Sequence, residues 1–406
     1  MEIKTLDGGG VTTPKRFMAG AAMAGIKTPD RYDLTIVYSQ TPASAAAVFT
    51  TNKVKAAPVL VSRANLEAGK GKARAVVFNS GCANACTGDQ GMADAGRITE
   101  AAALGLGCAG EEVLVASTGV IGAYLPMDKV LAGISRAAAE MKADGGAAAA
   151  RAIMTTDTVP KEIAAEIVTA GKTITFGAMA KGSGMIHPDM ATLLAMVTTD
   201  CAIGPELLKK ALWEACEATF HMVTIDGDTS TNDSLFILAN GTAGNTPPEN
   251  EADPVYREFV EGLTFVCLHL ARMIAKDGEG ASKFIEIRVE GAKTKRDARA
   301  AAKAVVGSSL VKAAIYGKDA NWGRILCAMG YSGADFDPDA TDLYIGDVQM
   351  MEKGRALIFD EEKALMWLEK DEVHILAKLN QGDGQATAWG CDLTHEYVTI
   401  NGSYRS

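Results

Sequence analysis

The residues best suited to chemistry lie in one segment, KGSGMIHPDMATLLAMVTTD, which spans residues 181–200. A glycine-rich stretch leads into Thr192, and an apolar, strand-like run follows it. An internal threonine hydroxyl is a poor nucleophile because no base lies beside it. Cutting the peptide bond between Ala191 and Thr192 would give Thr192 a free α-amine, which is a base on the same residue. The unperturbed pKa of such an amine is about 7.7–8.0, so a useful fraction is neutral near pH 7.

The hydroxyl of Thr192 also offers a route to the cut itself. Its attack on the carbonyl of Ala191 would give an ester that water hydrolyses, and backbone strain at this peptide would favour the shift. The freed residue could then accept an acyl group and pass it on. An Ala-Thr pair after a glycine-rich loop is common by chance, so the pattern alone is a weak indication. An ordinary strand threonine is the competing interpretation.

Neighbouring polar residues suggest other kinds of site, namely a histidine base, a metal site or a phosphate-binding loop, which compete with the terminal-threonine hypothesis. His187 lies five residues before Thr192 and is of the commonest general-base type, but the amine already supplies the base, so we expect a hydrogen-bonded bystander. The segment IDGDTSTND (225–233) lacks the spacing of a calcium loop, which favours a polar turn network near the site. KGSG lacks the spacing of a phosphate-binding loop. The five histidines show no zinc spacing, so neither a metal nor a cofactor is expected.

Seven motifs occur in order along nearly the whole chain. They are NSGCANACTG (79–88), STGVIG (117–122), MTTDTVPK (154–161), KGSGMIHPDMATLLAMVTTD (181–200), IDGDTSTND (225–233), YGKDANWGRI (316–325) and NGSYRS (401–406). In this set and order they resemble the ornithine acetyltransferase (glutamate N-acetyltransferase) family of arginine biosynthesis. Seven motifs together are far more specific than any one, and the segment around Thr192 is the most diagnostic of them.

The resemblance implies a reaction. The precursor would cleave itself between Ala191 and Thr192 into an α chain (1–191) and a β chain (192–406), which would stay together as an α2β2 assembly. In a ping-pong mechanism, N-acetylornithine would acetylate Thr192 and leave as ornithine, and glutamate would then take the acetyl group. Acetyl-CoA is a further candidate donor, as a substrate. The sequence does not separate a member that uses it from one that does not.

The resemblance also implies roles for individual residues. Thr118 and Gly119 match the oxyanion-hole pair, although a turn closing a strand is the plain alternative. A lysine suits the α-carboxylate that ornithine and glutamate share, and an acidic side chain can pair with the cationic end of ornithine. Thr155 is favoured over Thr158 as the contact from the TTDT run. The implied substrate contacts are Thr155 or Thr158, Lys181, Thr192, Glu279, Asn401 and Ser406.

Two positions differ from the commonest family pattern. Cys82 stands where the family more often has asparagine, so no side-chain role is assigned there. Ser406 stands where threonine is more usual, and it keeps the hydroxyl. Two other functions compete with acetyl transfer. One is an amidase or aminopeptidase with the same terminal nucleophile, which would release its acyl group to water. The other is an uncleaved, non-catalytic amino-acid-binding protein.

Composition narrows the class of protein. The chain has 406 residues, 48% of them hydrophobic and 22% charged, as in an ordinary globular enzyme. Its net charge of −10 argues against nucleic acid and anionic membrane surfaces as partners. Neither a membrane-length apolar run nor an apolar signal core is evident, so we expect the cytoplasm. The eight scattered cysteines are expected to be mostly buried free thiols.

The elements that must position these residues predict a mixed α/β fold of the α+β type. We expect an N-terminal-nucleophile-like sandwich of sheets and helices over residues 1–280, which contains the cleavage site, and a smaller C-terminal α/β domain over 281–406. Hydrophobic periodicity predicts strands at 34–39, 74–79, 112–116, 284–290, 372–379, 386–391 and 396–400, with the later ones in a mostly antiparallel sheet, and helices at 90–105, 127–141, 205–219 and 297–315. A loop is expected at 241–254 because the stretch is rich in Gly and Pro.

Overall fold

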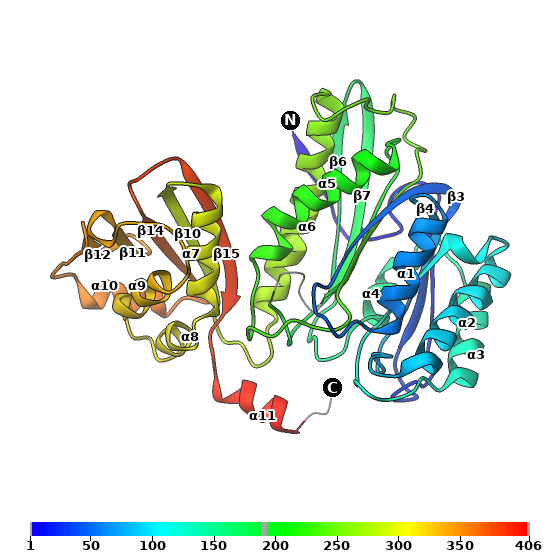
Figure 1. Ribbon diagram of the computed structural model, residues 1–406, viewed down its shortest axis with the longest axis horizontal. Helices are drawn as coiled ribbons and strands as arrows, with labels where there is room; N and C mark the ends of the chain where they lie inside the picture. The colour runs from blue at the N-terminus through cyan, green and yellow to red at the C-terminus, as the bar shows by residue number, and fades with distance from the viewer. Residues whose placement is uncertain (1, 188–192, 404–406) are drawn as a thin grey trace.

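The computed structural model describes residues 2–187 and 193–403 of the chain. A nine-stranded sheet dominates it, with the order β1-β6-β7-β8-β9-β3-β4-β5 and with β2 paired to β3 (Figure 1). Its strands are β1 (Ile3–Leu6), β2 (Phe17–Ala22), β3 (Leu34–Phe49), β4 (Lys72–Asn79), β5 (Val113–Ser117), β6 (Lys161–Thr169), β7 (Lys172–Lys181), β8 (Leu194–Thr199) and β9 (Ser234–Ala239).

The two halves of this sheet pack face to face. One buried cluster joins side chains from β7, β8 and β9 to side chains from β3, β4 and β5, including Met196, Phe236, Val76 and Phe78. The 16-residue strand β3 belongs to both halves, since its first part pairs with β4 and its last part with β9. The result is a sandwich of two sheet layers, as the sequence predicts.

Helices cover the outer faces of the sandwich (Figure 1). Three helices pack on the β3–β5 half through Ile98, Ile134 and Ala57, and two pack on the β6–β9 half through Leu212 and Phe259. The first group is α1 (Ala57–Ala68), α2 (Gly88–Leu106) and α3 (Met127–Ala139); the second is α5 (Pro205–Ala218) and α6 (Pro254–Lys276); the short α4 (Gly146–Ala152) contributes to the core between the sheet layers.

Strand register places the chemistry at one end of the central strands. Lys181, the last residue of β7, pairs with Leu194, the first residue of β8. Leu194 in turn pairs with Ser234, the first residue of β9. Strands β4 and β5 are parallel, with Asn79 beside Ser117, so the segments that follow these two strands leave the sheet at the same edge. Four of the seven motifs therefore meet where these strands begin or end.

A second sheet, of six strands, follows in the sequence. Its order is β13-β12-β11-β14-β10-β15, and only β10 and β14 run parallel among its pairs, so the predicted mostly antiparallel sheet is confirmed. Its strands are β10 (Phe284–Ala292), β11 (Asp342–Ile345), β12 (Val348–Glu352), β13 (Arg355–Ala356), β14 (Glu372–Lys378) and β15 (Gly384–Cys391). Its helices are α7 (Lys295–Gly307), α8 (Ser309–Tyr316), α9 (Trp322–Gly330) and α10 (Glu361–Leu368). The domain boundary near residue 280 stays a prediction.

Two of the predicted elements were wrong. The helix expected at 297–315 is broken at Ser308, whose backbone is extended. The Ser308 hydroxyl caps the start of α8 by accepting a hydrogen bond from Val311 N at 3.4 Å. The strand expected at 396–400 is part of the helix α11 (His395–Ser403). There the Thr394 hydroxyl accepts a hydrogen bond from Tyr397 N at 3.3 Å, and such a cap favours a helix over the strand that the alternating side chains suggest.

No helix within the described residues is both long and apolar enough to cross a membrane.

Candidate active site

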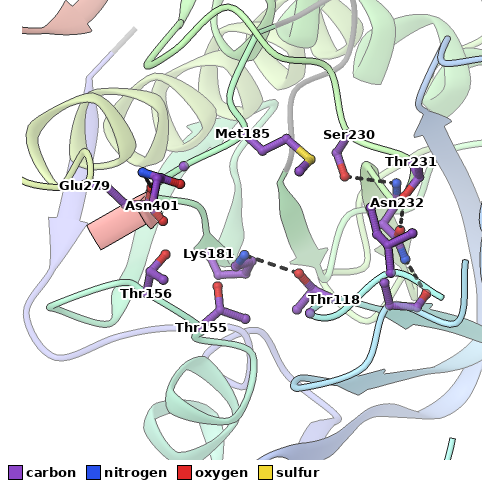
Figure 2. Close-up of a pocket in the computed structure, with 14 residues that line it drawn as sticks. Thr118, Thr155, Thr156, Lys181, Met185, Ser230, Thr231, Asn232, Glu279 and Asn401 are labelled. Atoms are coloured by element: carbon purple, nitrogen blue, oxygen red, sulfur yellow. Dashed lines mark hydrogen bonds between the residues drawn. The ribbon is translucent and has the colours of Figure 1, made fainter. Parts of the chain in front are cut away.

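A pocket opens where the motifs meet, at the edge of the nine-stranded sheet (Figure 2). Its lining residues are Ala83, Thr118, Gly119, Ile121, Thr155, Thr156, Lys181, Gly184, Met185, Ser230, Thr231, Asn232, Glu279 and Asn401. Six residues expected from the sequence are therefore brought together: Thr118, Gly119, Thr155, Lys181, Glu279 and Asn401. Ala191, Thr192 and Ser406 lie outside the described residues, and the substrate contacts themselves stay predictions.

Lys181 is the buried cation of the pocket. It ends β7, is 3% exposed, and its Nζ donates to Thr118 Oγ1 at 3.3 Å. Burial lowers the pKa of Lys181, and the nearby carboxylates of Asp157, Glu279 and Asp233 oppose that effect. A buried ammonium surrounded by acids and left with spare donors is a suitable partner for a carboxylate ligand.

Thr118 and Gly119 form a strained turn beside this lysine. Gly119 has φ +130°, and a Cβ on it would lie 2.3 Å from the carbonyl carbon of Gly81, so only glycine fits there. The backbone N–H of Thr118 already donates to Asn79 O at 3.0 Å. The donors that this turn can aim at a ligand are therefore the Thr118 hydroxyl, whose oxygen accepts from Lys181, and the Gly119 N–H. A hydroxyl beside a backbone N–H is chemically suited to hold an oxyanion.

Aspartates of the IDGDTSTND segment hold both flanks of the stretch that contains Thr192. Before it, Asp226 accepts from Met185 N at 2.5 Å and from Ile186 N at 2.8 Å. After it, the fully buried Asp233 accepts from Leu193 N at 3.0 Å, and burial raises the pKa of Asp233 well above its usual range. The polar turn network expected from the sequence is thus present on both sides of the proposed cleavage segment.

The backbone is strained shortly before this stretch. Met185 has φ +56°, a left-handed conformation that costs a non-glycine residue about 1–2 kcal/mol.

His187 Nδ1 lies 3.1 Å from the hydroxyl of Thr224. That contact agrees with the hydrogen-bonded bystander expected for His187.

The acidic side of the pocket comes from residues far apart in sequence. Asn401 Nδ2, on α11, donates to Glu279 Oε2 at 2.8 Å. Figure 1 shows α11 turning back from the six-stranded sheet toward the nine-stranded one. Glu279 packs so closely on Gly184 that a Cβ there would lie 2.3 Å from Glu279 Oε2. Glycine at 184 therefore lets the carboxylate enter the pocket.

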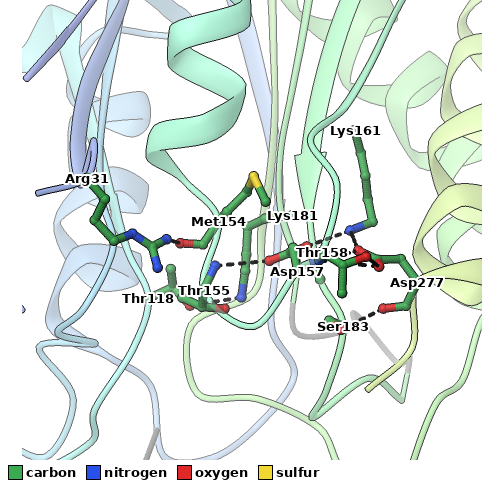
Figure 3. Close-up of polar contacts among 11 residues, drawn as sticks. Arg31, Thr118, Met154, Thr155, Asp157, Thr158, Lys161, Lys181, Ser183 and Asp277 are labelled. Atoms are coloured by element: carbon green, nitrogen blue, oxygen red, sulfur yellow. Dashed lines mark hydrogen bonds and ion pairs between the residues drawn. The ribbon is translucent and has the colours of Figure 1, made fainter. Parts of the chain in front are cut away.

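The two threonines of the TTDT run are placed differently. Thr155 lines the pocket, and its backbone N–H donates to Asp157 Oδ2 at 3.0 Å. Thr158 is not among the pocket's lining residues, since its N–H and hydroxyl both contact Asp277 (Figure 3). Thr155 thus lies in the pocket and Thr158 outside its lining, and the preference for Thr155 as the substrate contact stays a prediction.

Sequence reasoning missed several polar residues of the site. Ser230, Thr231 and Asn232 line the pocket, and Asn232 Nδ2 donates to Ala83 O at 2.6 Å and to Ser117 O at 2.8 Å. Asn232 thereby ties together three of the motifs. The available signal was the run of four hydroxyl and amide residues at 229–232, which ends two residues before the buried strand β9, but the direction of these side chains depends on tertiary packing.

Comparison with known proteins places the chain in a family. The model of the ArgJ family matches residues 18–406. The arginine biosynthesis bifunctional protein ArgJ of Symbiobacterium thermophilum is 56% identical over 400 residues, covering 98% of this chain and 99% of that protein. The protein of the same name from Caldanaerobacter subterraneus subsp. tengcongensis is 50% identical over 402 residues, covering 98% and 99%.

A solved structure agrees with the sequence comparison. The crystal structure of the arginine biosynthesis bifunctional protein ArgJ from Bacillus halodurans is 46% identical, with a TM-score of 0.50, and covers 52% of this chain and 98% of its own. The resemblance that the seven motifs indicate is thus confirmed. Because the family model extends over nearly the whole chain and the relatives match over almost their full length, the chain belongs to the ArgJ family of arginine-biosynthesis enzymes.

Proposed function

We propose that this protein cleaves itself between Ala191 and Thr192 and then transfers an acetyl group from N-acetylornithine to glutamate through an acetyl-Thr192 intermediate. The observation that carries the proposal is the pairing of Lys181, the last residue of β7, with Leu194, the first residue of the neighbouring strand β8. Leu194 is two residues after Thr192, and two residues span at most about 7 Å. The described part of the proposed β chain thus begins beside Lys181, which lines the pocket together with Thr118 and Gly119.

The charges of the pocket suit the proposed donor. N-acetylornithine carries an α-carboxylate and, at the other end, a side-chain ammonium. Lys181 is a cation for the first, and Glu279, held by Asn401, is an anion for the second. Glutamate shares the α-carboxylate, so it can use Lys181 in the same way. The reaction would be ping-pong, because the first product leaves before glutamate binds and the acetyl group stays on Thr192 in between.

The residues also account for each bond change. In maturation, the Thr192 hydroxyl oxygen attacks the Ala191 carbonyl, the amide breaks, and water hydrolyses the resulting ester, leaving a free α-amine. In turnover, that amine takes the hydroxyl proton as the oxygen attacks the acetyl carbonyl. The Thr118 hydroxyl and Gly119 N–H stabilise the oxyanion, a contribution typically worth roughly 10²–10³ in rate per donor. The proton then passes to the departing amine of ornithine, and glutamate reverses the sequence.

The size of a relative's solved chain supports cleavage. The Bacillus halodurans chain is 98% covered, yet it covers only 52% of this chain. A β chain of residues 192–406 would likewise be just over half of the 406 residues. The α and β products would stay associated, since β7 and β8 pair across the cleavage segment. The α2β2 assembly is what the family resemblance implies. Acetyl-CoA is a second candidate donor for the same acetyl-enzyme.

Intact-mass measurement tests the proposal directly. We expect two chains instead of one of 42.4 kDa, and an added acetyl group on the β chain after incubation with N-acetylornithine. Thr192→Ala should remain one inactive chain, whereas Thr192→Ser, which keeps a hydroxyl, should still be cleaved. A processed and active Thr192→Ala protein would refute the mechanism.

The same experiment separates the competing functions. An amidase or aminopeptidase would release free acetate at equal rate with and without glutamate. An amino-acid-binding protein would stay one chain and take up no acetyl group. Acetyl transfer requires that glutamate both remove the label from the β chain and appear as N-acetylglutamate.

A further inference from the structure

A chain of alternating buried charges runs behind the pocket (Figure 3). Lys161 Nζ, at the start of β6, donates to Asp157 Oδ1 at 2.7 Å and to Asp277 Oδ2 at 2.5 Å. The side chains of Lys161 and Asp157 have no exposed surface, and that of Asp277 is 8% exposed. Removing charges from water is costly, so a fully buried set of this kind needs a reason beyond stability.

Asp157 is the hub of this chain of charges. Besides Lys161, it accepts from Gly182 N at 2.7 Å through Oδ1 and from Thr155 N at 3.0 Å through Oδ2. Its oxygens thus accept from three donors, of which Thr155 lines the pocket and Gly182 directly follows Lys181. Lys181 makes its hydrogen bond elsewhere, to Thr118 Oγ1 at 3.3 Å. Asp157 therefore acts on Lys181 through its charge and leaves the ammonium donors of Lys181 for a ligand.

The charges around Lys181 depend on this arrangement. Burial lowers the pKa of Lys181, and Asp157 is the largest influence that raises it, followed by Glu279 and Asp233, while Lys161 lowers it further. Burial by itself raises the pKa of Asp157, but the charges of Lys181 and Lys161, together with the hydrogen bonds from Lys161 and Gly182, outweigh burial and leave this pKa below its usual range. Asp157 is therefore an anion at neutral pH.

The same chain reaches the acidic side of the pocket. Asp277 lies two residues before Glu279, and its carbonyl accepts from the Ser183 hydroxyl at 2.6 Å. Glu279 N in turn donates to Ser183 O at 2.8 Å. Lys161 thus joins the segment beside Lys181 to the segment that carries Glu279.

We propose that Asp157 is a positioning residue for acetyl transfer, which holds Lys181 as a cation with free donors and, through Lys161 and Asp277, fixes it relative to Glu279. This inference rests on the proposed function, because it assigns the substrate α-carboxylate to Lys181. A purely structural ion pair is the alternative, and it makes different predictions for the pH profile and for a double substitution.

The first test is Asp157→Asn, which keeps the shape and removes the charge. We expect self-cleavage to continue and KM for N-acetylornithine to rise roughly tenfold or more, with a smaller change in kcat, since a weakened carboxylate contact is lost largely in binding. Lys181 should also lose its proton more easily. The fall in kcat/KM on the alkaline side should therefore begin at a lower pH than in the wild type.

A double substitution distinguishes action through Lys181 from general damage. Lys181→Gln removes the cation on which Asp157 is proposed to act. In the wild-type background, Asp157→Asn is expected to lower kcat/KM roughly tenfold. If Asp157 acts through Lys181, the same substitution in the Lys181→Gln background should lower kcat/KM by less than about threefold. Fully additive losses would overturn the proposal.

Asp200→Asn is the matched control. Asp200 is another buried aspartate, it accepts from Thr175 N at 2.8 Å, and it lies outside the pocket lining. It should lower stability without moving the alkaline limb of the pH profile. An equal pH displacement in both variants would also overturn the proposal.

A charge-neutral variant covers the case in which Asp157→Asn fails to fold. Asp157→Asn combined with Lys161→Met removes both members of the pair without exposed surface, which is usually tolerated better than removing one. Asp277, which is partly exposed, then loses its contact with Lys161. This double variant should cleave itself and show a raised KM, with a smaller rise than in Asp157→Asn alone because Lys161 opposes Asp157 in its influence on Lys181. Wild-type kinetics in it would refute the proposal. If the wild type itself neither cleaves nor transfers acetyl, the proposed function fails first, and the two failures are thereby distinguished.

Discussion

Two groups of charged residues in this molecule pair cations with carboxylates in opposite surroundings. Behind the pocket, the side chains of Lys161 and Asp157 are completely buried. Between the end of α6 and the start of β14, Lys276 Nζ contacts Glu372 Oε1 at 2.5 Å, with the two side chains 46% and 38% exposed. Arg272 also pairs with Glu372, at 3.4 Å. Distances in the two groups are similar, so exposure is the main difference between them.

The difference shows what each group can do. Water and salt screen the exposed group, whose pairs each contribute about 0–1 kcal/mol. The buried group has no such screening, so its charges are committed to one geometry and act strongly on neighbours such as Lys181. The buried charges can therefore affect the protonation of neighbouring groups, whereas the exposed charges between α6 and β14 make a small contribution to stability.

The largest expected effect comes from Lys161→Met. This change leaves Asp157 and Asp277 without their shared cation, and an uncompensated buried charge typically costs about 3–5 kcal/mol. Urea denaturation measures the loss in the free energy of unfolding. The exposed counterpart, Lys276→Met, should cost less than about 1 kcal/mol. Equal losses in the two variants would remove the proposed distinction between the groups.

Loss of a half-buried carboxylate should reduce the free energy of unfolding by an amount between those expected for Lys161→Met and Lys276→Met. Glu217 on α5 pairs with Arg299 on α7 and lies 2.6 Å from His221 Nδ1, with its side chain 29% exposed. Burial by itself raises the pKa of Glu217, but the hydrogen bonds from Arg299 and His221 lower it to about 2. We expect Glu217→Gln to reduce the free energy of unfolding by about 1–2 kcal/mol at pH 7.

The sign of the pH dependence follows from this depressed pKa. An unfolded glutamate has a pKa of about 4.3, so the contribution of Glu217 is fully present above that pH. It is lost as the pH falls from there through about 2, the folded-state value. The difference in unfolding free energy between wild type and Glu217→Gln should therefore be constant from pH 7 to about 5 and shrink below about 4. A difference that grew on acidification would contradict this assignment.

The sequence predicts most elements because local patterns decide them. The helix at 205–219 begins at Pro205, and the strand at 284–290 alternates apolar and polar residues; both are confirmed by α5 and β10. The segment at 396–400 failed because its alternation suits either structure. Its state depends on the Thr394 cap, which also donates to Gly280 O at 2.7 Å, a contact that only tertiary structure provides.

Residues of the site could be predicted only where they belong to a motif of the family pattern. Lys181 and Glu279 were named from the family pattern, and the fold then placed both in one pocket. Asp157 stands in the same TTDT run as Thr155, yet nothing local marks it. Its role appears only when the ends of β6, β7 and α6 bring Lys161, Lys181 and Asp277 together around it.

The smallest expected effect concerns Glu372, and it tests screening directly. The hydrogen bond from Lys276 lowers the pKa of Glu372, so its contribution is present above about pH 4.3 and declines as the pH falls through the folded value. Glu372→Gln should cost less than about 1 kcal/mol at pH 7 in low salt. At ~1 M salt the Debye length is about 3 Å, so that cost should vanish.

Lys161→Met, measured in the same two salt conditions, is the control. Salt does not reach a pair without exposed surface, so its cost should remain nearly unchanged. If salt instead reduced both costs alike, water would have access to Lys161. The case for Asp157 as a positioning residue would then lose its physical basis, because a screened carboxylate cannot hold the charge of Lys181.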